Sequence, residues 1–160
     1  MRAAVVTIST SKAAGEGDDE SGPLLEEFAR RLGARAVSRE LLPDDRGAIE
    51  GALRRLCADD GVDLVLTTGG TGLAPSDVTP EATRAVIDRE IPGIGEAMRL
   101  ASRPHTAHWM LSRGVAGVHG RSLVVNFPGS PKSIQEVGGE LEAALRHALD
   151  LISGAASLHA

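Results

Sequence analysis

A glycine-rich turn holds the residues of this chain that are best suited to chemistry. Within the segment 64–82, three glycines, Gly69, Gly70 and Gly72, surround Thr71. Glycine has no side chain to block a ligand and adopts positive φ readily, so successive backbone N–H groups can converge on one anion. The hydroxyl of Thr71 adds a further donor. The pattern therefore predicts a phosphate-binding cradle over 69–72.

A helix is expected to begin close to this turn. Thr79 is a favourable N-cap residue and Pro80 suits the first helical position, so free amides and the positive end of a helix dipole are expected nearby. The turn lacks the lysine and spacing of a P-loop and the third glycine of a dinucleotide fingerprint. A tight connection without any ligand is the alternative, because glycines also serve ordinary turns.

Two acidic residues are expected at the mouth of the cradle. Asp77 follows the glycines, and Asp44 opens the helix after the second expected strand. A carboxylate about 4 Å from a phosphate charge is repelled by about 4 kcal/mol at an effective dielectric constant of about 20, so such acids imply a bridging Mg²⁺. The alternative is that each carboxylate only stabilises a helix N-terminus, which is worth about 0.3–1 kcal/mol.

Further polar residues later in the chain suit a phosphate ligand. Ser112 and Arg113 offer a hydroxyl and a guanidinium. No G-x-S-x-G sequence surrounds Ser112, so nucleophilic catalysis by this serine is disfavoured. Ser130 precedes Pro131, which is typical of a helix N-cap and equally of an anion-binding helix start.

Composition excludes several other classes of protein. The 17 Lys and Arg residues against 22 Asp and Glu give a net charge of −5, which disfavours a nucleic-acid surface. The single cysteine, Cys57, excludes an intrachain disulfide and is expected to be a buried core thiol. His105 and His108 have a spacing found in metal sites but no evident third ligand, so solvated loop histidines are favoured.

Length and hydropathy indicate one domain over 1–160 and no membrane association. The N-terminal segment 1–8 is too short for the apolar part of a signal peptide, and no apolar run approaches the roughly 18 residues of a membrane span. A cytoplasmic location is the resulting prediction.

The first half of the chain alternates between strand and helix patterns. Strands are expected at 3–8, 34–42 and 62–67, with amphipathic helices from 23 to Gly33 and from 49 to about Gly61 between them. This alternation favours a mostly parallel, doubly wound sheet between two helical layers. Ligands of such sheets bind beyond the carboxyl ends of the strands, where the flexible loop 9–22, the turn after Pro43 and the glycine turn would meet.

The second half is less regular. Helices are expected at 79–90 and 94–102, followed by an irregular stretch that contains 111–114 and 117–120. A buried strand over 122–127 and a long final helix complete the pattern. Gly138 and Gly139 together cost that helix about 2 kcal/mol relative to alanine, so a kink or a close contact is expected there.

Six segments taken together resemble the MoaB/Mog family of molybdenum cofactor biosynthesis. Their order and spacing match as well, and the segments around Asp19 to Pro23 and Pro43 to Asp44 are similar to the N-terminal half of the family. The matching segments are Thr-Gly-Gly-Thr-Gly at 68–72, Asp-Val-Thr-Pro-Glu-Ala at 77–82, Pro-Gly-Ile-Gly-Glu at 92–96, Leu-Ser-Arg at 111–113, Ala-Gly at 116–117 and Pro-Gly-Ser-Pro at 128–131.

The resemblance implies a three-layer α/β/α sandwich that binds the dithiolene pterin molybdopterin. In the adenylyltransferase branch of the family, the pterin phosphate receives AMP from Mg-ATP and pyrophosphate is released. Carried onto this sequence, the resemblance implies three groups of residues: an acidic pair that supports Mg²⁺ and the transfer, Asp44 and Asp77; a nucleotide-phosphate cradle, Gly69, Gly70, Thr71 and Gly72; and a pterin and phosphate site, Ser112, Arg113, Gly129 and Ser130.

The resemblance also implies a homotrimer and hand-over of the product to a molybdate-insertion protein. Two rival functions remain open: a noncatalytic molybdopterin-binding or scaffold protein, and a nucleotide-pyrophosphate hydrolase built on the related domain. One departure concerns the loop after the first strand, where family members often carry Ser-Asp and this chain has Ser9, Thr10 and Ser11.

Overall fold

A six-stranded, mostly parallel sheet forms the centre of the molecule. The computed structural model describes residues 1–59 and 61–155. The strands follow the order β2-β1-β3-β6-β5-β4, in which only the pairs β6–β5 and β5–β4 of the described sheet are antiparallel. Their bounds are β1 (Arg2–Ile8), β2 (Arg35–Leu42), β3 (Leu64–Thr68), β4 (Arg89–Glu90), β5 (Ala116–His119) and β6 (Ser122–Phe127).

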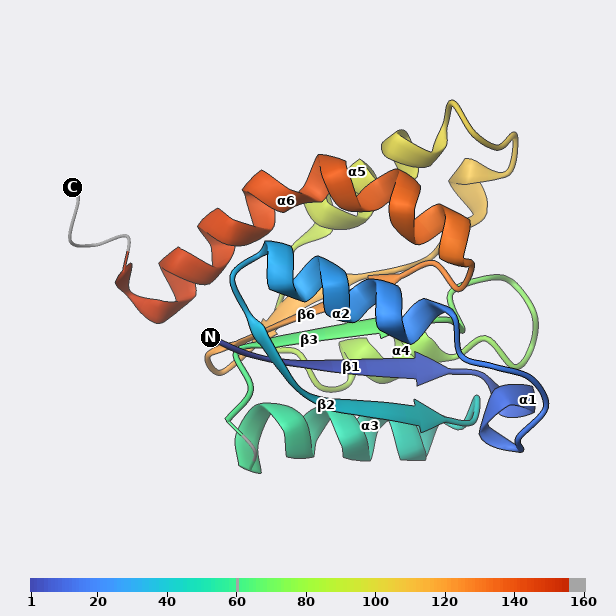
Figure 1. Cartoon of the computed structure of the whole chain (residues 1–160), viewed down its shortest axis with the longest axis horizontal. Helices are drawn as coiled ribbons and strands as arrows, with labels where there is room; N and C mark the ends of the chain where they lie inside the picture. The colour runs from blue at the N-terminus through green and yellow to red at the C-terminus, as the bar shows by residue number, and fades with distance from the viewer. Residues whose placement is uncertain (60, 156–160) are drawn as a thin grey trace.

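Helices cover both faces of the sheet, as the alternating pattern predicts (Figure 1). Helices α2, α5 and α6 contribute to one apolar core, whereas α3 and α4 contribute to the core on the opposite face. The three-layer α/β/α fold class is therefore confirmed. The helices are α1 (Thr10–Ala13), α2 (Ser21–Arg31), α3 (Arg46–Arg54), α4 (Thr79–Arg84), α5 (Pro92–Ser102) and α6 (Pro131–Ser153), with a π-helical turn η1 (Arg55–Asp59) and a 3₁₀ turn η2 (Trp109–Leu111).

The central strands place four loops at one edge. All residues of β3 and β6 are buried, which explains why neither strand alternates between apolar and charged residues. Strands β2, β1, β3 and β6 run parallel, so their carboxyl ends meet at the same side of the sheet, beside α1 (Figure 1). The loops that follow these strands begin at Ser9, Pro43, Gly69 and Pro128.

The prediction of a flexible loop over 9–22 is wrong in part, because this segment contains α1 and the start of α2. The Ser9 hydroxyl accepts a hydrogen bond from the Lys12 N–H at 3.4 Å and caps the short α1. The Asp19 carboxylate accepts one from the Gly22 N–H at 2.9 Å, so α2 begins at Ser21 rather than at Pro23. The short α1 has no buried residue and is held by capping hydrogen bonds. Its sequence therefore shows no apolar periodicity from which a helix could be predicted.

The prediction of one helix over 79–90 is also wrong, because α4 ends at Arg84 and a short strand follows. Strand β4 pairs with β5, which lies in the stretch expected to be irregular. Gly117 permits this pairing: a Cβ at Gly117 would lie 2.6 Å from the carbonyl oxygen of Arg89. Gly117 is therefore needed for the close approach of β4 to β5 and does not form a turn.

Two smaller predictions concern packing. The close contact expected in the last helix lies at Gly138, where a Cβ would lie 3.3 Å from the Phe28 ring, whereas the Cβ position of Gly139 is open. Cys57 is half-buried beside the core of α3 and α4 and not fully in it, and burial raises the pKa of its thiol. No helix within the described ranges is long and apolar enough to cross a membrane.

Candidate active site

The glycine turn folds tightly against neighbouring backbone. Gly69 and Gly70 have φ values of +98° and +65°, which favour glycine. A Cβ at Gly69 would overlap the carbonyl oxygen of Ile8, and one at Gly70 would overlap the Thr79 hydroxyl. These positions therefore require glycine for both conformation and space.

The four carbonyl oxygens of the turn all accept hydrogen bonds from the protein. In a trans peptide unit the C=O and the following N–H point in opposite directions, so a held carbonyl also aims the next amide. The bonds are Thr79 hydroxyl to Gly69 O at 2.9 Å, Thr79 N–H to Gly70 O at 3.1 Å, Arg113 N–H to Thr71 O at 2.9 Å and Arg113 Nε to Gly72 O at 2.8 Å.

The amides on the opposite side of the turn have no acceptor among the described residues. This holds for the N–H groups of Gly70, Thr71 and Gly72. The same three residues line a cavity of about 490 Å³. Uncommitted amides beside a cavity form the kind of concave site that binds anions.

Asp44 is held at this edge by the loop after β1. Its Oδ2 accepts hydrogen bonds from the Thr10 N–H and from the Thr10 hydroxyl, both at 2.9 Å, while its N–H donates to that hydroxyl at 3.0 Å. Its Oδ1 lies 3.3 Å from the position that a Gly70 Cβ would take. The carboxylate therefore lies against the glycine turn.

The prediction that Asp44 opens the following helix is wrong. Asp45 is the N-cap of α3, since its Oδ1 accepts from the Ala48 N–H at 2.7 Å. Consecutive acids can each cap a helix, and the sequence does not choose between them. The Asp44 carboxylate is thus free of that structural task.

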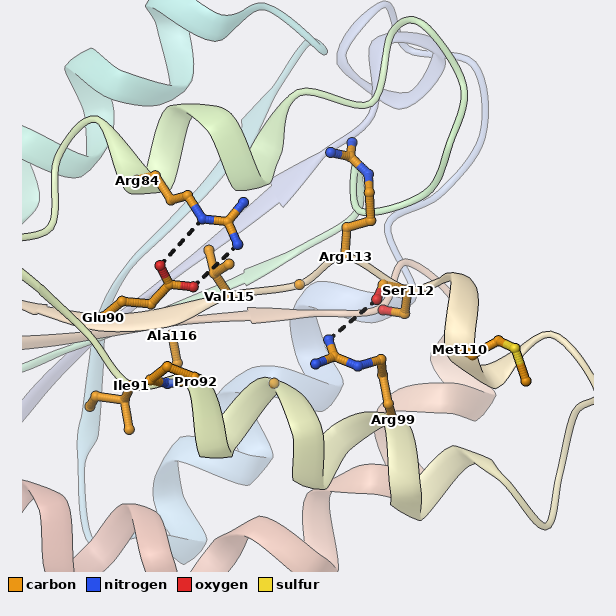
Figure 2. Close-up of a pocket in the computed structure, with 12 residues that line it drawn as sticks. Arg84, Glu90, Ile91, Pro92, Arg99, Met110, Ser112, Arg113, Val115 and Ala116 are labelled. Carbon is orange, nitrogen blue, oxygen red and sulfur yellow. Dashed lines mark hydrogen bonds and ion pairs between the residues drawn. The ribbon is translucent and has the colours of Figure 1, made fainter.

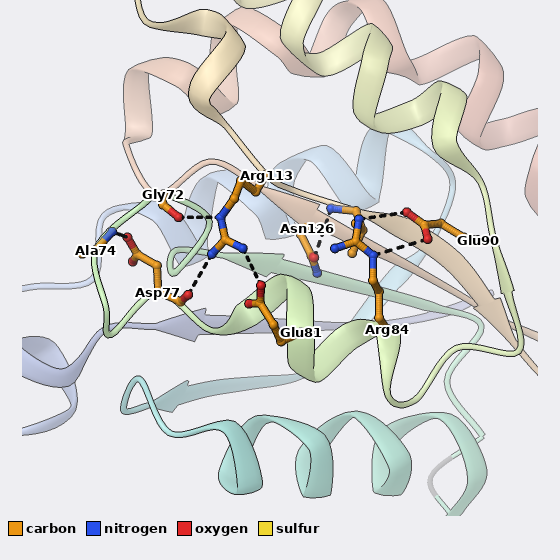
Figure 3. Close-up of polar contacts among 9 residues, drawn as sticks. Gly72, Ala74, Asp77, Glu81, Arg84, Glu90, Arg113 and Asn126 are labelled. Atoms are coloured by element: carbon orange, nitrogen blue, oxygen red, sulfur yellow. Dashed lines mark hydrogen bonds and ion pairs between the residues drawn. The ribbon is translucent and has the colours of Figure 1, made fainter.

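Asp77 lies on the other side of the turn, in the loop between the glycines and α4. Its Oδ2 accepts from the Ala74 N–H at 2.9 Å and lies 2.8 Å from the position that a Gly72 Cβ would take. Figure 3 shows this loop and the Arg113 guanidinium that spans it. Both predicted acids therefore approach the turn where glycine leaves space.

The donor set suits Mg²⁺. Asp44 and Asp77 each have one carboxylate oxygen, Oδ1, without a hydrogen bond in the described part of the chain. Magnesium is commonly held by one or two carboxylates together with substrate phosphates and water. Within residues 1–59 and 61–155, no group of three His, Cys, Asp or Glu side chains could hold a metal by itself.

Ser112, Gly129 and Ser130 line the same cavity as the glycine turn. The prediction that Ser130 caps the last helix is confirmed, because its side chain accepts from the Ser133 N–H at 3.0 Å. The structure therefore brings together nine of the ten predicted site residues around one edge: Asp44, Gly69, Gly70, Thr71, Gly72, Asp77, Ser112, Gly129 and Ser130.

Arg113 is placed differently, with its guanidinium committed to protein groups. It lines a neighbouring cavity of about 300 Å³ (Figure 2). There Arg84 pairs with Glu90, and Arg99 donates to the carbonyl oxygen of Ser112 at 3.4 Å. The Arg113 side chain points away from Arg99 in Figure 2. A contact between Arg113 and the pterin phosphate stays a prediction.

Sequence reasoning missed three residues that shape the site: Thr10, Thr79 as a donor to the turn, and Glu81. Glu81 forms an ion pair with Arg113, whose hydrogen bond holds the pKa of the Glu81 carboxyl below its ordinary value. The position of Glu81 in the first turn of α4 was the one sequence feature that could have marked it as a site residue. Stabilisation of the helix dipole explains an acidic residue there equally well.

A family model described as a probable molybdopterin binding domain matches residues 4–147. The chain belongs to this family. The resemblance to the MoaB/Mog family is thereby confirmed, and it extends over most of the sequence.

Individual relatives agree with this membership. The chain is 39% identical to a molybdopterin adenylyltransferase of Helicobacter pylori strain J99, over 94% of this chain and 86% of the relative. It is 43% identical to a molybdopterin adenylyltransferase of Escherichia coli K12, over 85% of this chain and 71% of the relative. The crystal structure of the molybdopterin biosynthesis enzyme MoaB of Thermus thermophilus superposes with a TM-score of 0.89 at 44% identity, covering 96% of both chains.

Proposed function

We propose that this protein is a molybdopterin adenylyltransferase, which transfers AMP from Mg-ATP to the molybdopterin phosphate and releases pyrophosphate. The observation that carries the proposal is the glycine turn. Its carbonyls are held by protein, its residues line a cavity and have amides without an acceptor in the described part of the chain, and two carboxylates lie against it. Relatives of this name at about 40% identity support the same activity.

The division of the site follows from its chemistry. Gly69, Gly70, Thr71 and Gly72 would hold the nucleotide phosphates, and Asp44 with Asp77 would hold Mg²⁺. When bound, this cation supplies positive charge between the carboxylates and the phosphates. Ser112, Gly129 and Ser130, with Arg113 nearby, would hold the pterin and its phosphate.

No covalent intermediate with the protein is required. An oxygen of the pterin phosphate attacks the α-phosphorus of ATP, a new P–O bond forms, the α–β phosphoanhydride bond breaks, and pyrophosphate leaves. The protein aligns the two anions for an in-line displacement, and the turn amides stabilise the negative charge on the transferring group. The homotrimer and the hand-over to a molybdate-insertion protein stay predictions of the resemblance, and the cytoplasmic location stays a prediction from the sequence pattern.

Mixing the purified protein with molybdopterin and Mg-ATP tests the proposal. We expect adenylylated pterin and pyrophosphate in equal amounts. Pterin binding without either product would instead favour the noncatalytic scaffold, and turnover of ADP-ribose in the absence of pterin would favour the pyrophosphate hydrolase.

The two neighbouring acids after β2 provide a matched pair of variants. Asp44→Ala is expected to lower turnover by about 100-fold, because it removes a carboxylate that would hold the Mg²⁺ that compensates the phosphate charge. Asp45→Ala is expected to leave turnover unchanged and to lower the free energy of unfolding by about 1 kcal/mol, because it removes only the cap of α3. Steady-state kinetics and thermal unfolding measure both effects. A loss of turnover in Asp45→Ala as large as that in Asp44→Ala would contradict the assignment of the site acid to Asp44 alone.

A further inference from the structure

We propose that Thr79 and Arg113 are positioning residues that orient the phosphate-binding amides of the glycine turn. Together they donate all four hydrogen bonds that the turn carbonyls accept. The inference rests on the proposed function, since it explains how the nucleotide half of that site obtains its geometry.

Thr79 controls the first half of the turn. The residue is completely buried, its hydroxyl holds Gly69 O and its N–H holds Gly70 O. Because C=O and N–H are opposed in each peptide unit, these two bonds aim the amides of Gly70 and Thr71 away from α4. Thr79 does not act as the N-cap of α4, a position occupied by Val78 without a side-chain hydrogen bond. Its hydroxyl is thus used for the turn and not for the helix.

Arg113 controls the second half. Its own N–H holds Thr71 O and its Nε holds Gly72 O, which aims the amides of Gly72 and Leu73. Its Nη2 donates to the carbonyl oxygen of Asp77 at 2.9 Å, and its Nη1 pairs with Glu81 (Figure 3). One guanidinium therefore fixes both ends of the loop that carries the Asp77 carboxylate and ties this loop to α4.

The alternative role for Arg113 is direct binding of the pterin phosphate. Three N–H groups of its guanidinium already donate to protein oxygens, and the residue lines the neighbouring cavity and not the cavity shared by the turn and Ser130. The negative charge of Glu81 also compensates the positive charge of Arg113, which weakens the attraction of Arg113 for a phosphate. This geometry points to an action through the turn and Asp77.

The pair Thr79→Val and Thr79→Ser isolates the hydroxyl. Valine keeps the shape of threonine and loses the donor, whereas serine keeps the donor. We expect Thr79→Val to weaken Mg-ATP binding, measured by titration calorimetry without pterin, by about tenfold, and Thr79→Ser to stay within about twofold of the original chain. Equal affinities of the Val and Ser variants would overturn the role of Thr79.

Arg113→Lys and Glu81→Gln distinguish positioning from direct binding. Lysine is a point charge that cannot span Gly72, Asp77 and Glu81 at once. We expect Arg113→Lys to raise the KM for ATP by about tenfold with the KM for molybdopterin within about twofold, and Glu81→Gln to shift the same parameter in the same direction by less. An increase confined to the KM for molybdopterin would overturn the positioning role.

The outcomes separate this inference from the proposed function. If the unmodified chain binds no Mg-ATP, the proposed function is wrong. If the unmodified chain binds Mg-ATP and transfers AMP while Thr79→Val and Arg113→Lys bind it equally well, only the positioning role is wrong. Circular dichroism of each variant establishes that folded protein is compared, and Arg113→Lys provides the test if Thr79→Val does not fold.

Discussion

Replacing Asp77 by alanine is expected to lower kcat for adenylyl transfer by about 1000-fold while the chain still folds. The carboxylate lies against the glycine turn, and in the proposed function its Oδ1 would hold the Mg²⁺ that compensates the phosphate charge. Its structural task is one hydrogen bond from the exposed Ala74 segment, worth about 1 kcal/mol. The loss of activity should therefore far exceed the loss of stability.

Asp77→Asn separates these two roles. The amide oxygen can still accept the Ala74 N–H, while the negative charge is gone. We expect a melting temperature close to that of the original chain and a kcat as low as that of Asp77→Ala, both measured on the same preparation. Turnover that survives in Asp77→Asn would remove the carboxylate charge from the mechanism.

Gly69→Ala is expected to lower the free energy of unfolding by about 3–5 kcal/mol, which corresponds to a decrease in melting temperature of roughly 10 °C. The new Cβ would overlap the carbonyl oxygen of Ile8 in β1, and the residue would have to keep a φ of +98°. The nearest atoms all belong to the backbone of Ile8, so no flexible side chain could move aside. Mg-ATP binding should be lost together with stability, because the whole turn must shift.

Gly139→Ala is the matched control. Gly139 lies within α6, and no atom stands within 4 Å of the position that its Cβ would take. Alanine in a helix interior is favoured over glycine by about 1 kcal/mol, so this variant should be slightly more stable and fully active. If Gly69→Ala melts at the temperature of the original chain, the close approach of the turn to β1 is refuted.

The sequence predicted those parts of the fold in which local pattern and tertiary environment agree. Continuous apolar runs identified β1, β3 and β6, and helical periodicity identified α2, α3 and α6. The alternation of these elements was sufficient for the layers and for the edge at which the loops meet. The glycine turn was predictable because glycines at the end of a buried strand supply the positive φ and the space that a tight turn against neighbouring backbone needs.

The other parts of the fold and site depend on tertiary contacts, which the sequence pattern does not indicate. The residues of β4 became a strand only because β5 lies beside them, and Gly117 had the appearance of a turn residue although it serves that pairing. Because Asp44 and Asp45 are adjacent, the sequence alone does not show that Asp45 caps α3 while Asp44 binds the loop after β1. The bonds from Arg113 to a loop some 40 residues earlier likewise arise from tertiary packing.

Transfer of label from ATP tests the central claim most directly. The purified protein is incubated with molybdopterin, Mg²⁺ and ATP labelled at either the α- or the γ-phosphate, and the pterin and pyrophosphate are separated. We predict that the α-label appears in the pterin product and the γ-label in pyrophosphate, one of each per turnover. A pterin product without the α-label, or no labelled product at all, would contradict the assignment of this site to adenylyl transfer.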